Sequence, residues 1–93
     1  MHCVYIMTNI YNTTFYVGRT SCLERRVFEH KLGFVEGFTK KYKCTKLVYF
    51  ECCDDFYATL ERERKIKKYP RHWKLRLIET KNPQWDDLSE FIS

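Results

Sequence analysis

Two segments near the N-terminus, residues 3–8 and 14–19, are rich in the β-branched and aromatic side chains that favour strands. Residues 9–12 between them read Asn-Ile-Tyr-Asn and suit a turn, so the pattern predicts a β-hairpin. If the loop holds an even number of residues, Tyr5 and Tyr16 share one face of the hairpin, because side chains alternate along a strand. The apolar side chains of the other face are then Val4, Ile6, Phe15 and Val17.

The next segment has the start and stop signals of a helix. Ser21 and Glu24 have the spacing of a capping box, and Gly33 is a natural C-terminal stop. These signals predict a helix over about residues 22–32.

Helical phase orders the charged side chains of this segment. At 100° per residue, Arg26 and His30 lie one turn apart beside the apolar positions Leu23 and Val27, whereas Arg25 points away. Arg26 and His30 are therefore expected to border the core.

The remaining pattern predicts a third strand and several further elements. Residues 34–43 suit either a loop or a short helix, and residues 46–51 have the composition of a strand. A long helix should begin after Asp54 or Asp55 and end near Lys68 or Tyr69, because Pro70 follows. We further expect helices over 71–79 and 84–92, with Trp85, Leu88 and Phe91 pinning the last one to the core.

These elements define a fold class and a domain organisation. We expect an α+β protein with a small three-stranded antiparallel sheet flanked by helices and an extra C-terminal helix. Residues 1–80 should form the main domain, and residues 81–93 a tail helix packed on the same domain.

Glu63 stands out in the long helix. Phe56 and Leu60 set an inward stripe, and Glu63 occupies its next position, where an apolar residue is expected, while Glu61 is turned about 100° away. A carboxylate turned toward a core needs a cation or a metal, because an unpaired buried charge is costly. An ion pair with an arginine is the ordinary alternative to a metal site.

Composition limits the class of protein. The 93 residues are 44% hydrophobic and 17% aromatic, enough for one modest core. Seventeen basic and twelve acidic side chains give a net charge of +5, which favours anionic partners without identifying one. No run approaches the roughly 20 apolar residues of a membrane span, and no signal peptide is evident, so we expect a cytoplasmic protein without membrane contact.

The cysteine pattern indicates neither a zinc site nor a disulfide framework. The count is odd, and no CxxC pair or Cys/His spacing suited to zinc occurs. We therefore expect reduced thiols in a reducing compartment. The five cysteines are Cys3, Cys22, Cys44, Cys52 and Cys53.

Taken together, the candidate residues resemble the signature of the GIY-YIG nucleases. The motif Cys-Val-Tyr at 3–5 is similar to the first half of the signature, and Tyr-Val-Gly at 16–18 to the second. Arg26 follows Tyr16 by ten residues, and His30 follows Arg26 by four. Cys3 stands in place of the first glycine of the family's name motif.

The resemblance extends over almost the whole chain. Leu60 precedes Glu63 by three residues, as a leucine precedes the metal-binding glutamate in the family's later helix. Residues 38–42, 46–49 and 82–88 are similar to the small bacterial stand-alone members. The asparagine that some larger relatives add has no clear match.

The resemblance implies roles for these side chains. Glu63 would hold one Mg²⁺ or Mn²⁺, and Arg26 would grip a phosphate oxygen. Tyr5 would orient or deprotonate the attacking water, with His30 relaying the proton and Tyr16 bonding the phosphate or the water. A deprotonated Tyr5 at neutral pH would require its pKa to fall by about three units from its ordinary value near 10. Further nucleic-acid contacts are expected from Arg19, Lys40, Lys41, Arg62 and Lys67.

The resulting hypothesis is a metal-dependent endonuclease that hydrolyses phosphodiester bonds in DNA or structured nucleic acid, with a place in DNA repair or recombination. DNA is favoured over RNA, and contacts should be mainly to the backbone. The alternative is a non-catalytic nucleic-acid-binding module of the same fold. A protein-interaction adaptor would rest only on the aromatic tail of Trp85, Leu88 and Phe91.

Overall fold

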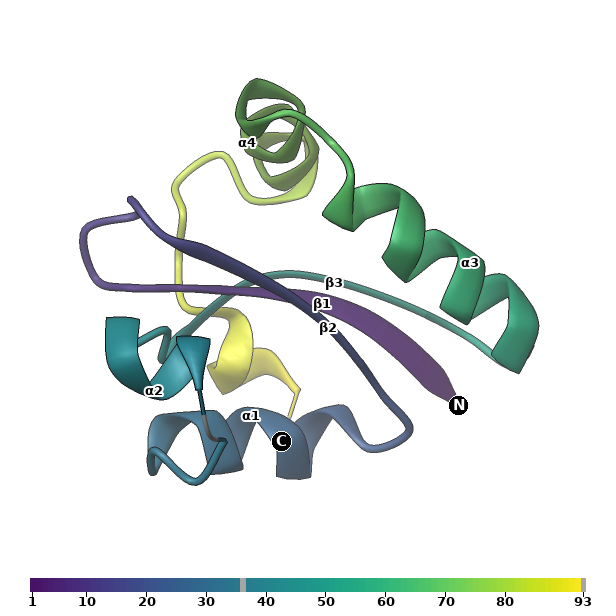
Figure 1. The fold of residues 1–93 in the computed structure, drawn as a ribbon, viewed down its shortest axis with the longest axis horizontal. Helices are drawn as coiled ribbons and strands as arrows, with labels where there is room; N and C mark the ends of the chain where they lie inside the picture. The colour runs from purple at the N-terminus through teal and green to yellow at the C-terminus, as the bar shows by residue number, and fades with distance from the viewer. Residues whose placement is uncertain (36, 93) are drawn as a thin grey trace.

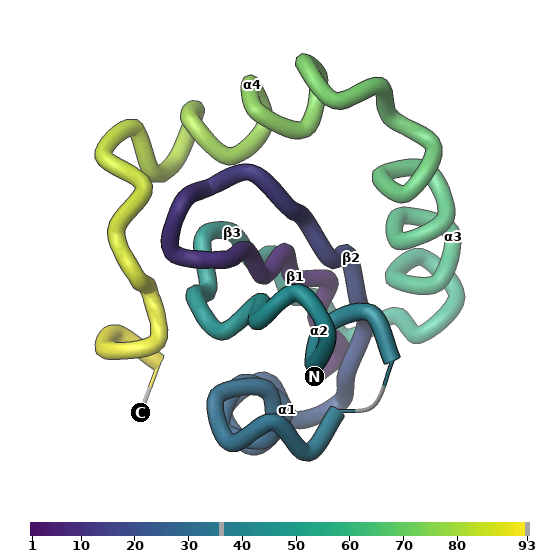
Figure 2. The backbone as a smooth tube through the Cα atoms, turned by 60° about the vertical axis from the view of Figure 1, so that its left-hand side comes forward, coloured from purple at the N-terminus to yellow at the C-terminus, as the bar shows by residue number. Residues whose placement is uncertain are grey.

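A three-stranded antiparallel sheet lies between two groups of helices in the computed structural model, which describes residues 1–35 and 37–92 (Figure 1). Helices α3 and α4 lie on one side of the sheet, and α1, α2 and the C-terminal 3-10 helix η1 on the other (Figure 1). Figure 2 shows the helical segments arranged around the sheet. The elements are β1 (His2–Thr8), β2 (Phe15–Thr20), α1 (Leu23–Lys31), α2 (Phe38–Tyr42), β3 (Lys46–Cys53), α3 (Phe56–Lys67), α4 (Arg71–Lys81) and η1 (Leu88–Phe91).

The sheet has the order β2-β1-β3, so the first strand is central. In β1 and β2, Tyr5 pairs with Gly18 and Met7 with Tyr16, which places both tyrosines on one face as predicted. The register produces two cores, one on each face. The α3–α4 side contains Val4, Ile6, Val17, Val48, Tyr49, Ile66 and Ile78. The α1 side contains Tyr5, Met7, Val27, Cys44 and Leu47.

The start of α3 follows its predicted signal, whereas the start of α1 does not. Asp55 caps α3 by accepting hydrogen bonds from the backbone N–H groups of Tyr57 and Ala58. The predicted capping box of α1 is wrong, because Cys22 is the N-cap and makes no side-chain cap bond. Thr20 instead accepts a hydrogen bond from the Cys22 N–H at 3.0 Å, so a side chain from the end of β2 holds the turn.

The tail differs from the predicted helix over residues 84–92. Trp85 has a positive φ of 57°, which interrupts any regular helix, and η1 is confined to Leu88–Phe91. Trp85 packs on the α3–α4 core and Leu88 on the α1 core, so the tail passes from one face to the other. Phe91 is 74% exposed and does not pin the tail; Ile92 packs there instead.

Side chains of the tail also bond the outer strand β3. Asn82 donates from Nδ2 to the Val48 carbonyl at 3.1 Å. The Leu47 N–H donates to Asp87 Oδ1 at 3.3 Å. Asp87 in turn accepts from Lys31 of α1 at 2.6 Å. The tail is thereby tied to both β3 and α1.

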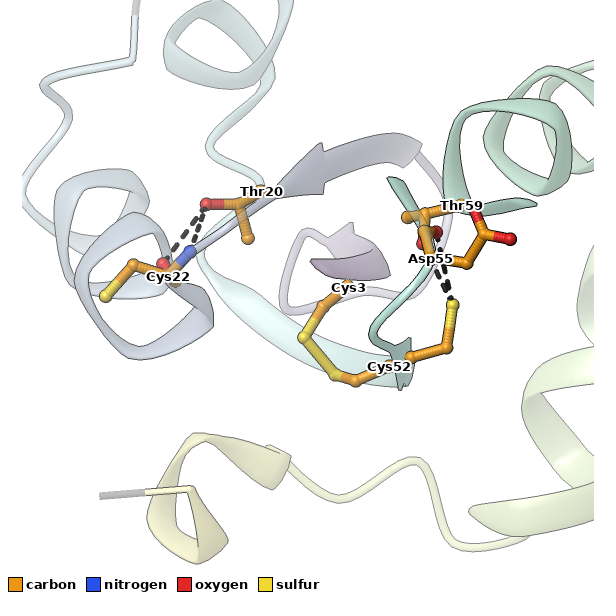
Figure 3. Close-up of a disulfide and its surroundings, with 7 residues drawn as sticks. Cys3, Thr20, Cys22, Cys52, Asp55 and Thr59 are labelled. Atoms are coloured by element: carbon orange, nitrogen blue, oxygen red, sulfur yellow. Dashed lines mark hydrogen bonds between the residues drawn. A yellow bond between two sulfur atoms is a disulfide. The ribbon is translucent and has the colours of Figure 1, made fainter. Parts of the chain in front are cut away.

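The expectation that all cysteines are reduced is wrong for two of them. Cys3 in β1 pairs directly with Cys52 in β3, their Cα atoms are 4.0 Å apart, and the two side chains form a disulfide (Figure 3). Cys22, Cys44 and Cys53 are free thiols. The register between strands far apart in sequence decides this pairing, and cysteine spacing carries no information about it. Among the described residues, no helix is long and apolar enough to cross a membrane.

Candidate active site

Tyr5, Tyr16 and His30 form one cluster between the sheet and α1. The hydroxyl oxygen of Tyr5 lies 2.9 Å from His30 Nε2, within hydrogen-bond distance. The ring centroid of Tyr16 lies 6.2 Å from that of Tyr5 and 5.3 Å from that of His30. Tyr5 and His30 are buried, and Tyr16 is partly exposed. Two strands and a helix therefore bring together three side chains that the sequence spreads over 26 positions.

Gly18 makes this packing possible. It lies opposite Tyr5 in the neighbouring strand. A Cβ atom at this position would lie 2.5 Å from the Tyr5 hydroxyl oxygen and 2.8 Å from Cε2 of Tyr16, closer than real contacts allow. The role of Gly18 in making room for the tyrosines was not foreseen from the sequence. Its place two residues after Tyr16, on the same face, is the signal that was available.

Arg26 of α1 borders this cluster, as helical phase predicts. Its side chain is 42% exposed, against 78% for Arg25. Its Nη1 atom lies 3.3 Å from Oε1 of Glu29, one turn along the helix. Sequence reasoning missed Glu29, although the i,i+3 spacing is typical of a helical ion pair. The charge of Arg26 acts on both Tyr5 and His30.

The electrostatics of the free protein oppose charge on either partner of the 2.9 Å contact. Burial lowers the pKa of His30 to about 4, and the positive charge of Arg26 adds to this effect. Burial, with a further contribution from Tyr16, raises the pKa of Tyr5 above its ordinary value of 10. Arg26 acts in the opposite direction, and Glu63 raises the Tyr5 pKa further. In the free protein, therefore, the Tyr5 pKa shift has the opposite sign to the one that a deprotonated Tyr5 would require.

Glu63 lies on the inward side of α3, although the stripe differs from the predicted one. Thr59 and Ile66 are the buried residues of this helix, whereas Phe56 is 38% exposed. Glu63 falls between them at i+4 and i−3, and its side chain is 14% exposed. Glu61 is exposed. Helical phase therefore identifies Glu63 rather than Glu61 as the inward-facing glutamate, although Phe56 does not lie on the buried side of the helix.

Two cations contact the Glu63 carboxylate. Arg19 Nε lies 3.9 Å from Oε1, and Lys67 Nζ lies 3.4 Å from Oε2. Within residues 1–35 and 37–92, no group of three or more His, Cys, Asp or Glu side chains could hold a metal ion. Mg²⁺ keeps several waters and often takes only one or two protein carboxylates, so the hard oxygens of Glu63 suit a sparsely ligated divalent ion. The predicted metal ligand is chemically suitable, provided that a contacting cation moves.

The predicted nucleic-acid contacts are dispersed. Lys40 and Lys41 lie on α2, where the Lys41 ammonium is 5.5 Å from the Tyr42 ring. Arg62 instead faces β3, with Nε 2.5 Å from Glu51 Oε1 and Nη1 3.3 Å from the Tyr69 hydroxyl. Its guanidinium group therefore serves an internal ion pair.

Comparisons with known proteins identify the family of this chain. Residues 1–76 match the family described as the GIY-YIG catalytic domain. A UPF0213 protein of Haloquadratum walsbyi is 41% identical over 78 residues, which cover 84% of this chain and 86% of that protein. A UPF0213 protein of Clostridium perfringens is 37% identical over 93 residues, covering 100% of this chain and 99% of that protein.

A solved structure shows the same fold. The solution NMR structure of a UPF0213 protein from Bacillus halodurans matches with a TM-score of 0.60 and 22% identity, over 99% of this chain and 97% of that one. The chain belongs to the GIY-YIG family, a family of nucleases that act on nucleic acids and generally use divalent metals.

Proposed function

We propose that this protein is a metal-dependent endonuclease that hydrolyses phosphodiester bonds in DNA or structured nucleic acid, with DNA favoured over RNA and a place in DNA repair or recombination. The observation that carries the proposal is the contact between Tyr5 and His30, buried beside Tyr16 and within reach of the Arg26 charge. Residues 1–80 would form the nuclease domain, with residues 81–93 a tail of the same domain.

The phosphate is the natural partner of Arg26. Its guanidinium group stays charged at all relevant pH values and offers a planar pair of donors to phosphate oxygens. In the free protein Glu29 neutralises this group on the partly exposed surface of α1. A phosphate oxygen can replace that carboxylate, and charge that accumulates on phosphorus oxygens during attack is then stabilised.

Tyr5 and His30 handle the proton of the attacking water. With a neutral His30, the Tyr5 hydroxyl donates to Nε2, and its oxygen is left to accept a hydrogen bond from water. As the water oxygen bonds to phosphorus and the P–O bond to the leaving group breaks, the water proton passes to Tyr5 and the Tyr5 proton to His30. The high Tyr5 pKa disfavours a standing phenolate, and the low His30 pKa disfavours a standing imidazolium, so the two proton transfers have to be concerted with the attack.

Glu63 would hold the divalent ion. A bound Mg²⁺ or Mn²⁺ supplies charge neutralisation at the leaving oxygen. Arg19 lies next to Glu63 and could contact the same phosphate. Backbone contacts from the lysines of α2 would add affinity that depends on salt but not on sequence.

A cleavage panel tests this proposal. Linear, nicked, branched and single-stranded DNA and RNA are incubated with Mg²⁺, with Mn²⁺, or with chelator. Wild-type protein should cut at least one substrate only with metal. Glu63→Gln should abolish cleavage, while Glu61→Gln on the exposed side of the same helix should leave it unchanged. Equal cleavage in chelator, or full activity of Glu63→Gln, would contradict the mechanism. Salt-sensitive binding without cleavage of any form would identify a non-catalytic binding module instead.

A further inference from the structure

The Glu63 carboxylate is contacted by cations from two different elements. Arg19 of β2 faces one oxygen at 3.9 Å, and Lys67 of α3 faces the other at 3.4 Å. The carboxylate is only 14% exposed, so water screens these contacts less than it would on an open surface. A divalent ion and an ammonium group repel each other strongly at contact distance. Metal binding at Glu63 therefore requires one of the two cations to move.

The two cations differ in how firmly they are held. The Arg19 side chain is 28% exposed, and its guanidinium carbon lies 4.9 Å from the centre of the Phe56 ring. Its Nε atom is buried, so moving it would disturb the packing between β2 and α3. The Lys67 side chain is 52% exposed, and its ammonium group reaches Glu63 from one turn along the same helix. A change of rotamer takes this group into solvent.

We propose that Lys67 is an exchangeable counter-ion for the metal ligand: its ammonium neutralises Glu63 in the metal-free protein and withdraws when a divalent ion binds. This inference rests on the proposed function, because it takes Glu63 as the metal ligand. Lys67 is then a positioning residue that keeps the carboxylate compatible with its partly buried site.

Metal binding without nucleic acid tests this role. Mn²⁺ is titrated calorimetrically into the full chain as wild type, Lys67→Gln and Lys65→Gln. An ion pair of this type is worth up to about 1 kcal/mol, so Lys67→Gln should bind Mn²⁺ up to about fivefold more tightly than wild type. Lys65 is an exposed residue of the same helix and carries the same charge. Its replacement should change the affinity for Mn²⁺ by less than about twofold.

The outcomes separate this inference from the proposed function. Mn²⁺ binding that is lost in Glu63→Gln and tightened in Lys67→Gln supports both. If Glu63→Gln abolishes binding but Lys67→Gln and wild type have equal affinity, Lys67 is not the counter-ion, although the metal assignment stands. Weaker Mn²⁺ binding by Lys67→Gln than by wild type likewise means that Lys67 is not the counter-ion. Mn²⁺ binding that survives Glu63→Gln, or no binding by either wild type or Lys67→Gln, overturns the metal assignment together with the role of Lys67.

Discussion

The two faces of the sheet each carry a buried tyrosine beside charged side chains, and the two groups differ in how fully they are bonded. On the α3–α4 face, the Tyr49 hydroxyl donates to Glu51, which also accepts from Arg62. On the α1 face, the Tyr5 hydroxyl meets His30, whose Nδ1 is buried without a hydrogen-bond partner among the described residues. Buried polar groups are normally satisfied, and each exception calls for an explanation, of which a functional role is one.

The Tyr49 group has the features of a structural network. Hydrogen bonds and the positive charge of Arg62 lower the pKa of Glu51, even though burial acts in the opposite direction. The pKa of Tyr49 is raised to about 12 by burial and by Glu51, so the phenol stays protonated and serves as a donor. Each charge has an opposite charge beside it. In the Tyr5 group, by contrast, His30 Nδ1 has no hydrogen-bond partner among the described residues and is available to a ligand. A buried tyrosine therefore has a structural role on one face and a candidate catalytic role on the other.

The sharpest way to break this comparison is to remove the two hydroxyl groups separately. Tyr5→Phe should lower the cleavage rate at least about 100-fold, the usual contribution of a positioned proton-transfer group. Tyr49→Phe should leave the rate within about twofold and lower the free energy of unfolding by about 1 kcal/mol, as for a lost hydrogen bond. Rates are compared under single-turnover conditions, with unfolding measured in urea. Equal rate losses in the two variants would show that the two faces do not differ in function.

A side chain added at Gly18, against the Tyr5 ring, should give the next largest effect on cleavage and stability. Gly18→Ala places a methyl group 2.5 Å from the Tyr5 hydroxyl oxygen, and overpacking of this kind costs about 1–3 kcal/mol. Cleavage should fall as well, because the ring must shift from its contact with His30. Gly18→Ala combined with Tyr5→Phe should lose less stability than the sum of the single changes. Strict additivity in denaturant unfolding would mean that the Tyr5 hydroxyl does not contribute to the clash, because ring carbon Cζ, 2.6 Å from the added Cβ, remains in the Phe variant.

Removing Arg62 from the Tyr49–Glu51–Arg62 network of the α3–α4 face should lower the free energy of unfolding but leave the cleavage rate unchanged. Arg62→Met leaves Glu51 without its main cation and should lower the free energy of unfolding by about 1–2 kcal/mol, since the pair is partly exposed. Glu51→Gln combined with Arg62→Met should recover part of that loss. Cleavage measured well below the melting temperature should match wild type. A large loss of cleavage in a folded Arg62→Met protein would instead favour the nucleic-acid contact predicted for this residue.

The smallest expected effect is a pH dependence carried by His30. Its pKa is about 4 in the folded protein and 6.5 in the unfolded chain, so the unfolded chain takes up the proton first as the pH falls. The stabilising contribution is thus complete above pH 6.5 and is lost as the pH falls toward 4. Between about pH 7 and 5.5 this loss should be about 1 kcal/mol. His30→Gln should show a shallower decline in urea unfolding over that interval, and an unchanged slope would contradict the buried neutral state.

Much of the fold follows from local signals. The strand composition of β1 and β2, the Asp55 cap and the break at Pro70 predict elements that the structure contains. The failures are details of local hydrogen bonding and backbone conformation that composition does not reveal. Thr20, rather than Ser21, holds the start of α1, and the positive φ of Trp85 interrupts the tail helix.

The candidate site divides in the same way. Alternation along strands places Tyr5 and Tyr16 on one face, and phase along helices favours Arg26 over Arg25 and Glu63 over Glu61, because each rule acts within one element. The spacing that resembles the family signature then makes them candidates. The partners Glu29 and Gly18 were within reach of the same rules. The Cys3–Cys52 bond and the Arg62–Glu51 pair were not, because each joins elements whose relative placement the pattern leaves open. The sign of the Tyr5 pKa shift likewise depends on burial, which only packing decides.

The side chains of Asn82 and Asp87 that bond β3 have a consequence for self-association. An outer strand presents unpaired backbone groups that can recruit a strand from another chain. Asn82 bonds the Val48 carbonyl, and Asp87 accepts from the Leu47 N–H, so the tail occupies positions that an incoming strand would use. A chain shortened after Lys81 should therefore aggregate edge to edge, while β2, at the opposite edge, is unchanged. We expect the tail to hinder this strand pairing, whatever part it has in recognising a partner.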